Sequence, residues 1–292
     1  MAADSRQDFL VRAMPAVFVA IWSTGFIVAR FGMPHSPPMT FLAMRYVLSV
    51  LCFAAWALAA RAAWPREGRQ LWHLAVTGVL MHAGYLGGVW AAVKHGMGAG
   101  LVALLVGLQP VLTAVWVSSR GGAVHARQWL GLLFGLAGLV LVVWQKLGLG
   151  EVHPDNLLLA FVALVSITAG TLYQKRFVAP CDVRTANLVQ LAAAFVVTLP
   201  LALAESESMR FNGQLAGSMA WSVLALTLGG SSLLYLLIQR GAATAVTSLL
   251  YLVPPCTALM AWVLFGEPIT VLTIAGMALT AVGVSLVVRS RA

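Results

Sequence analysis

Ten apolar runs follow one another along this chain, separated only by short polar segments. Each run has about 20 residues, the length that an α-helix needs to cross a bilayer. Only 9% of the 292 residues are charged, whereas a soluble domain carries roughly a quarter. The pattern predicts an all-α membrane protein with ten transmembrane helices and no room for a soluble domain. The expected helices are 11–33, 39–61, 70–93, 97–119, 126–147, 155–177, 184–204, 216–239, 242–265 and 269–289.

The basic residues predict how these helices are oriented. With the N-terminus placed inside, 13 of the 18 Lys and Arg residues fall in inner segments and only three fall in outer ones. Cytoplasmic loops of membrane proteins carry this excess, so we expect both termini in the cytoplasm. The net charge of +9 then belongs to the loops and does not indicate nucleic-acid binding. The first apolar run is too long for a signal peptide and is expected to be retained.

A proline-containing run recurs along the chain at a constant offset. Gly96–Trp116 matches Gly241–Ala261 when 145 is added to each number, which places Pro110 on Pro255. The same offset aligns further glycines: Gly25 with Gly170, Gly84 with Gly229, Gly121 with Gly266, Gly131 with Gly276, and Gly138 with Gly283.

The offset predicts two units of five helices, residues 1–147 and 148–292. Because five is odd, the second unit must enter the membrane with the opposite orientation. Inverted repeats are a recurrent transporter architecture, with the substrate site near the midplane between the halves. The alternative is a duplicated scaffold that transports nothing.

Three prolines lie inside predicted helices and would interrupt them. Pro110, Pro254 and Pro255 each remove a backbone hydrogen bond, and Pro110 would free the carbonyl of Val106. Freed carbonyls at membrane depth are tolerated where they face protein or a wet cavity. They could accept hydrogen bonds from a substrate ammonium, or the prolines could serve only to kink the helices for packing.

Polar side chains on two helices are candidates for substrate contacts. His82 lies at mid-depth with Tyr85 three residues further on, and an ionisable group inside a membrane indicates a functional site by default. Ser248 and Tyr251 share one helical face. The alternatives are a neutral histidine held by a neighbour and hydroxyls that only bond other helices.

Four further residues have two possible roles each. Trp22 and Tyr173 could form stackable walls for a substrate side chain or could be packing residues. Gln109, beside the proline, either binds substrate or caps freed backbone. Arg45 either snorkels or pairs with a helix end, or it faces an anion, and the offset matches it to the uncharged Gln190.

All nine acidic residues fall in loops or at helix ends. A proton-coupled exporter of drug cations needs a buried acid, so the sequence argues for neutral or zwitterionic solutes. It leaves the energy source open, although the chain carries no phosphate-binding P-loop for ATP. The three cysteines share no motif spacing, and we expect no disulfide framework, no metal site and no cofactor.

Four segments carry a resemblance to a known family. WSTGFIVAR (22–30), FLAMRYVLSV (41–50), LLVGLQPVLTA (104–114) and LLYLVPPCTALMAWVLFGEP (249–268) resemble the EamA branch of the drug/metabolite transporter superfamily. Within it the chain is most similar to YddG-type amino-acid exporters. The resemblance implies ten helices in two inverted halves. One departure is that Gly121-Gly122-Ala123 lacks the Gly-Glu pair seen at Gly266-Glu267.

The predicted function is export of small amphipathic metabolites, amino acids including aromatic ones, across a bacterial inner membrane. Partners would be this solute and membrane lipid, in a protein that is a monomer and not an enzyme. Two other kinds of transporter and one kind of enzyme are the alternatives. A sugar-phosphate or nucleotide-sugar transporter would need several buried cations, a cationic-drug exporter would need a buried acid, and a membrane-embedded enzyme would need metal-binding or paired acids at a membrane face.

Overall fold

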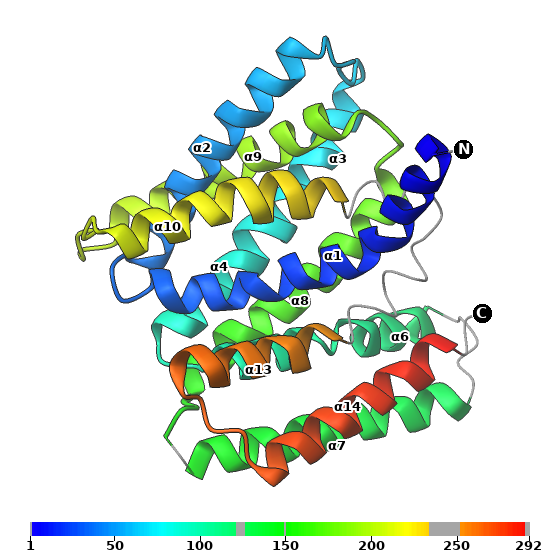
Figure 1. Cartoon of the computed structure of the whole chain (residues 1–292), viewed down its shortest axis with the longest axis vertical. Helices are drawn as coiled ribbons and strands as arrows, with labels where there is room; N and C mark the ends of the chain where they lie inside the picture. The colour runs from blue at the N-terminus through cyan, green and yellow to red at the C-terminus, as the bar shows by residue number, and fades with distance from the viewer. Residues whose placement is uncertain (1, 121–125, 149, 234–251, 290–292) are drawn as a thin grey trace.

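The computed structural model describes residues 2–120, 126–148, 150–233 and 252–289, and within these ranges the chain is helical with no strand (Figure 1). The helices are packed in one bundle, and the two termini lie on the same side of it. Their bounds are α1 Ala2–Gly32, α2 Pro38–Ala59, α3 Gly68–Gly78, η1 Val79–Gly84, α4 Tyr85–Lys94, α5 Ala99–Val106, α6 Gln109–Ser119, α7 Ala126–Gly148, α8 Pro154–Phe177, α9 Val183–Ala204, α10 Gly213–Trp221, η2 Ser222–Ser231, α13 Val253–Phe265 and α14 Val271–Arg289.

The helices confirm a membrane protein. Six helical segments of the described chain are long and apolar enough to cross a bilayer, and three shorter apolar helices accompany them. Large apolar side chains on the outside of the bundle are open to a lipid environment, with Trp144 76% exposed and Leu203 77% exposed. Ten spans remain a prediction, because the expected helices 216–239 and 242–265 lie partly outside the described residues.

Local chemistry explains where several helices begin. Pro38 and Pro154 occupy the first turn of α2 and α8, where no intrahelical N–H is needed. The Asp182 carboxylate caps α9 by accepting a hydrogen bond from the Arg184 backbone N–H at 2.9 Å. Hydrogen bonds from Arg184 also hold the pKa of Asp182 below its ordinary value.

The third helix of each predicted repeat contains a π-helical segment. In the first repeat α3, η1 and α4 form one continuous helix, and in the second α10 runs directly into η2. Adding 145 to η1, residues 79–84, places it at 224–229, inside η2. π-Helical turns are rare and are often found at functional sites. Their presence at matched positions makes this level of the bundle a candidate for the functional site.

The expected fourth helix is interrupted. Helix α5 ends at Val106 and α6 begins at Gln109, which makes Pro110 the second residue of α6. A proline is readily accommodated in a first turn, so it starts a new helix after a break at 107–108. Pro254 and Pro255 likewise lie in the first turn of α13. The kink expected at those two prolines lies at the edge of the described residues, since 234–251 are outside them.

Close packing between the repeats shows a reciprocal pattern. Helices α7 and α14 lie side by side (Figure 1), and small residues let their backbones approach. A side chain on Gly138 would collide with the Gly276 carbonyl, and one on Gly283 would collide with the Gly131 carbonyl. Adding 145 converts 138 to 283, and subtracting it converts 276 to 131. The two contacts therefore exchange with each other.

A second pair of contacts exchanges in the same way. Gly25 of α1 packs on Leu226 of η2, and Gly170 of α8 packs on Met81 of η1. The offset again converts one contact into the other. Helix α2 likewise packs against its counterpart α9, and α5 packs against α13, which is the counterpart of α6. Exchange of this kind is expected of two repeats related by a two-fold axis.

Candidate functional site

Polar and aromatic side chains from six elements meet inside the bundle. They come from α1, α2, η1, α4, α9 and η2, so both predicted repeats contribute. We refer to them as the Arg45 cluster, which consists of Trp22, Arg45, Tyr46, His82, Tyr85, Gln190 and Thr227. Three predicted site residues, Trp22, His82 and Tyr85, are thereby brought together.

Arg45 lies at the centre of this cluster and is only 5% exposed. It lies seven residues into α2, about 10 Å along the helix axis from its start. Its Nε and Nη2 atoms donate to the Thr227 hydroxyl at 3.1 and 3.0 Å. That hydroxyl donates in turn to the Ser222 carbonyl at 2.8 Å, within the π-helical segment η2. Arg45 does not snorkel to the surface.

His82 lies in the matching π-helical segment η1. Its ring makes a polar side-chain contact with Gln190 of α9. Its backbone carbonyl accepts a hydrogen bond from the Tyr46 hydroxyl at 2.9 Å, and the two rings lie edge to face with centroids 6.2 Å apart. Since a π-turn loosens the regular backbone bonding, the Tyr46 hydroxyl bonds backbone at the point where the helix widens.

Aromatic side chains enclose the polar groups. Tyr85 is buried, and its hydroxyl makes a polar contact with Trp22 of α1. The Arg45 guanidinium lies over the Trp90 ring, 6.0 Å from its centroid, near the limit for an attractive cation–π contact. Trp90 is 1% exposed, as expected for a packing residue.

The polar contacts of Arg45 and His82 are related by the repeat. The offset of 145 converts Arg45 into Gln190 and His82 into Thr227, so the pair Arg45–Thr227 corresponds to the pair Gln190–His82. The sequence analysis singled out His82 and noted Arg45 and Gln190 but missed Thr227 as a site residue. Applying the offset to His82 would have identified it. No sequence signal pointed to Tyr46.

Gln109 and Tyr173 belong to other contacts. The Gln109 amide donates to the Thr171 hydroxyl of α8 at 2.9 Å, and the Tyr173 hydroxyl lies 2.7 Å from Nδ1 of His73 in α3. Within the described ranges no polar contact links either residue to the Arg45 cluster. Ser248 and Tyr251 lie outside the described residues, so their predicted role stays a prediction.

The two proline-containing segments face each other. A side chain on Gly107, in the break between α5 and α6, would lie 3.0 Å from Pro254. Gly100 of α5 similarly faces the backbone of Ala258 in α13. The break in the fourth helix therefore packs directly on the first turn of its counterpart, and the glycine makes this close approach possible.

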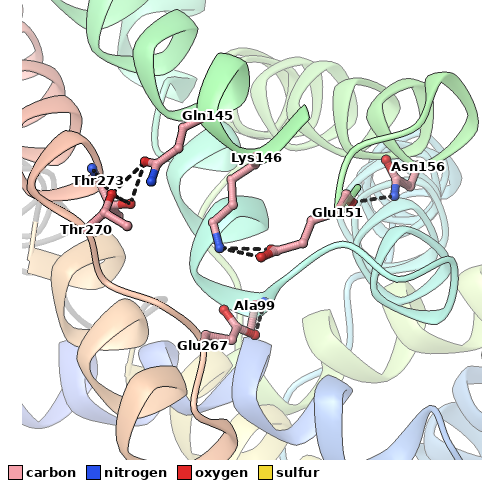
Figure 2. A network of polar contacts seen from close by, with 8 residues as sticks. All are labelled: Ala99, Gln145, Lys146, Glu151, Asn156, Glu267, Thr270 and Thr273. Carbon is pink, nitrogen blue, oxygen red and sulfur yellow. Dashed lines mark hydrogen bonds and ion pairs between the residues drawn. The ribbon is translucent and has the colours of Figure 1, made fainter. Parts of the chain in front are cut away.

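Carboxylates join loops and helix starts at one end of the bundle. Glu267 accepts a hydrogen bond from the Ala99 N–H at the start of α5, at 3.0 Å. Figure 2 shows this contact next to the ion pair of Lys146 with Glu151, whose shortest N–O distance is 2.7 Å. Glu205 accepts in the same manner from the first turn of α2, at 2.7 Å from the Thr40 N–H. These contacts connect the two repeats at this end.

The arrangement has a definite chemical character. It offers one permanent cation, a histidine, an amide and several hydroxyls, with aromatic faces beside them. No acid lies among the described cluster residues. Such a site can bind an anionic or neutral polar group and an adjacent apolar or aromatic group. It has no group suited to pair with a drug cation.

Comparison with known proteins agrees with this architecture. Over 264 residues the chain is 25% identical to the uncharacterized inner membrane transporter YedA of Escherichia coli (strain K12), covering 89% of this chain and 84% of that protein. It is 25% identical to a protein of Salmonella typhimurium (strain LT2) named "Probable amino-acid metabolite efflux pump", covering 91% and 90%. It is 24% identical to the uncharacterized transporter YvbV of Bacillus subtilis (strain 168), covering 93% and 89%.

A solved crystal structure shows the same fold, with a TM-score of 0.69 at 19% identity over 94% of this chain and 95% of the other. The sequence profile of the EamA-like transporter family matches twice, at residues 13–144 and 156–289. Each match covers one of the two predicted repeats. With its membrane helices, its reciprocal contacts and this doubled match over most of its length, the chain belongs to the EamA-like transporter family.

Proposed function

We propose that this transporter exports small amphipathic metabolites, amino acids including aromatic ones, by alternating access around a site between its two halves. The halves are residues 1–147 and 148–292, each with five transmembrane helices, and the second is inverted relative to the first. The proposed substrate-binding residues are Trp22, His82, Tyr85, Gln109, Tyr173, Ser248 and Tyr251, of which the first three belong to the Arg45 cluster.

The reciprocal contacts support this mechanism. Gly138–Gly276 and Gly131–Gly283 exchange under the repeat offset, as do Gly25–Leu226 and Gly170–Met81. Two halves joined by equivalent contacts can rock to one side or the other of a central site with similar packing in both states. Small residues at the interfaces permit the sliding that such a motion requires.

The chemistry of the Arg45 cluster supports the substrate class. A zwitterionic amino acid needs a partner for its carboxylate, polar acceptors for its ammonium and an apolar surface for its side chain. The cluster combines a cation, hydroxyls and an amide with aromatic rings. The relative named as an amino-acid metabolite efflux pump agrees with this class.

The cellular setting follows from the charge distribution and the relatives. The excess of Lys and Arg in alternate loops supports a cytoplasmic location for both termini. The relative YedA is named as an inner membrane transporter, and we propose the same bacterial membrane for this chain. Ten helices can enclose a pathway in one chain, so we propose a monomer surrounded by lipid.

The observation that carries the proposal is the Arg45 cluster, which unites helices of both repeats at the level of the matched π-helical segments. The test is flux of a panel of labelled amino acids, phenylalanine, tryptophan and leucine among them, into proteoliposomes that contain the purified protein. We expect protein-dependent counterflow of at least one of them, compared with empty liposomes. Absence of protein-dependent flux across the whole panel would overturn the substrate class.

A further inference from the structure

Arg45 is electrostatically unlike every other buried group that the structure describes. Only two charged side chains there are buried, Arg45 and Lys146, each 5% exposed. Lys146 is neutralised by Glu151 at 2.7 Å. Among the residues that the structure describes, Arg45 has only the neutral hydroxyl of Thr227 as its hydrogen-bond partner.

The chain holds no acid that could neutralise Arg45 at its depth. The sequence contains no Asp or Glu from 9 to 66, from 68 to 150 or from 208 to 266. The neighbouring elements α2, η1, α4 and η2 all lie within these stretches. A buried charge without a counter-ion is costly and is retained in membranes mainly where it has a function.

The guanidinium also has unused donors. Arginine carries five N–H groups in a planar fork. Two nitrogens, Nε and Nη2, donate to the one oxygen of Thr227, and Nη1 donates no hydrogen bond within the described part of the chain. A single hydroxyl cannot satisfy a fork whose geometry matches the two oxygens of a carboxylate.

The surroundings select the kind of anion. A phosphate dianion calls for several cations, and the only other titratable base in the cluster is His82. One carboxylate needs one guanidinium. Trp22 and Tyr85, which are paired with each other beside Arg45, present aromatic surface where the rest of a small acid would lie. An amphipathic monocarboxylate fits these groups, whereas a sugar phosphate does not.

We propose that Arg45 binds the carboxylate of the transported solute. The protein is therefore selective for small monocarboxylates over analogues in which an uncharged group replaces the carboxylate. This inference rests on the proposed export of amino acids and names the group that recognises them. Thr227 is a positioning residue, because it holds the guanidinium without contacting the solute. The carboxylate of the solute then serves as the counter-ion of Arg45 in each transport cycle.

The test compares matched ligands on the purified full-length protein in detergent. Thermal-shift titrations use L-phenylalanine and L-leucine against L-phenylalaninamide and L-leucinamide, which keep the ammonium and side chain but lack the carboxylate. We expect each acid to stabilise the wild-type protein and each amide to bind at least about tenfold more weakly. Equal stabilisation by acid and amide, or none by any acid, would overturn the inference.

Four variants separate recognition from structure. Arg45→Gln should lose the preference for the acid, whereas Lys146→Gln, which removes the other buried cation, should keep it. Thr227→Val should lower the ligand-free melting temperature and still prefer the acid. If Arg45→Gln yields no folded protein, Arg45→Lys decides, because loss of the bidentate fork should raise the Kd for the acid by about tenfold. An unchanged Kd in Arg45→Lys contradicts the inference.

The flux panel keeps the two proposals apart. Protein-dependent flux of amino acids, combined with an acid preference that survives in Arg45→Gln, would leave the transport function intact and remove Arg45 as its carboxylate site. Absence of flux together with an Arg45-dependent acid preference would contradict transport of the tested amino acids while supporting the carboxylate site.

Discussion

The Arg45–Thr227 pair and the Gln190–His82 pair occupy equivalent places in the two repeats and differ in charge. In both, a polar residue of the second helix bonds a residue in the π-helical segment of the opposite repeat. One pair carries a permanent cation, and the other carries an uncharged amide with a histidine. The packing around them is nearly symmetric, but the chemistry is not.

This difference shows how duplicated folds acquire a polarised site. The glycine contacts between α7 and α14 must remain equivalent in both halves, because a side chain on Gly138, Gly276 or Gly283 would collide with the backbone of the facing helix. The polar pairs are free to diverge, since exchanging one buried hydrogen-bonding group for another preserves the packing. A site with a cation on one side can orient a zwitterion, which a symmetric site cannot do.

The largest expected effect tests the symmetric part of the comparison. Gly138→Val and Gly283→Val should each destabilise the protein by about 3 kcal/mol or more, because the new side chain meets backbone of the facing helix. The two losses should be similar. Unfolding followed by tryptophan fluorescence in detergent measures them. Gly217→Val is the control, since nothing lies within 4 Å of a Cβ placed there, and an equally large loss in it would refute the packing argument.

The second-largest expected effect tests the difference in charge between Arg45 and its counterpart Gln190. Arg45→Gln should reduce amino-acid counterflow at least about tenfold through loss of a charge-assisted bond, whereas Gln190→Ala should reduce it only a few-fold. Adding Gln190→Arg to Arg45→Gln moves the cation to the other half and should restore part of the flux. Equal losses in Arg45→Gln and Gln190→Ala would show that the charge itself is unimportant.

A smaller effect is expected at the histidine. His82→Ala removes the ring that bonds Gln190 and should lower counterflow by about threefold to tenfold, in the range of one lost neutral hydrogen bond. His35→Ala is the matched control, because His35 bonds Gln214 at the end of the bundle, at 3.0 Å. Unchanged flux in His82→Ala would remove His82 from the substrate site.

The smallest effect on transport concerns Thr227. Thr227→Val deletes the acceptor of two Arg45 hydrogen bonds and should cost about 1–3 kcal/mol of stability, visible as a lower melting temperature without ligand. Counterflow at saturating substrate should change by less than about twofold, since the guanidinium remains. A tenfold loss of flux with an unchanged melting temperature would instead assign Thr227 to substrate contact.

Much of the architecture could be predicted because its causes are local. Apolar runs of spanning length must form helices to satisfy their backbone in lipid, and Pro38, Pro154 and Asp182 mark helix starts by their own chemistry. An interruption of the helix at Pro110 was expected as well, and the helix breaks at 107–108. Only the structure shows that this break packs on Pro254, where Gly107 permits the close approach.

The candidate site was predicted only in part. Trp22, His82 and Tyr85 were expected as site residues, and they lie in one cluster. Gln109 and Tyr173, which were also predicted to bind substrate, contact Thr171 and His73, and their role in substrate binding stays a prediction. Depth along a helix can be read from the sequence, but the direction in which a side chain points cannot be read where apolar residues surround the helix.

The sequence by itself determined the membrane class, the approximate helix bounds and the repeat, since hydropathy, charge placement and a constant offset are properties of the chain alone. Only the tertiary structure decided which side chains meet. It paired Arg45 with Thr227 and His82 with Gln190 across 182 and 108 positions of sequence. The physical reason is that such contacts depend on how two helices are rotated and shifted against each other, which interlocking glycines and π-helical turns establish only when the halves pack.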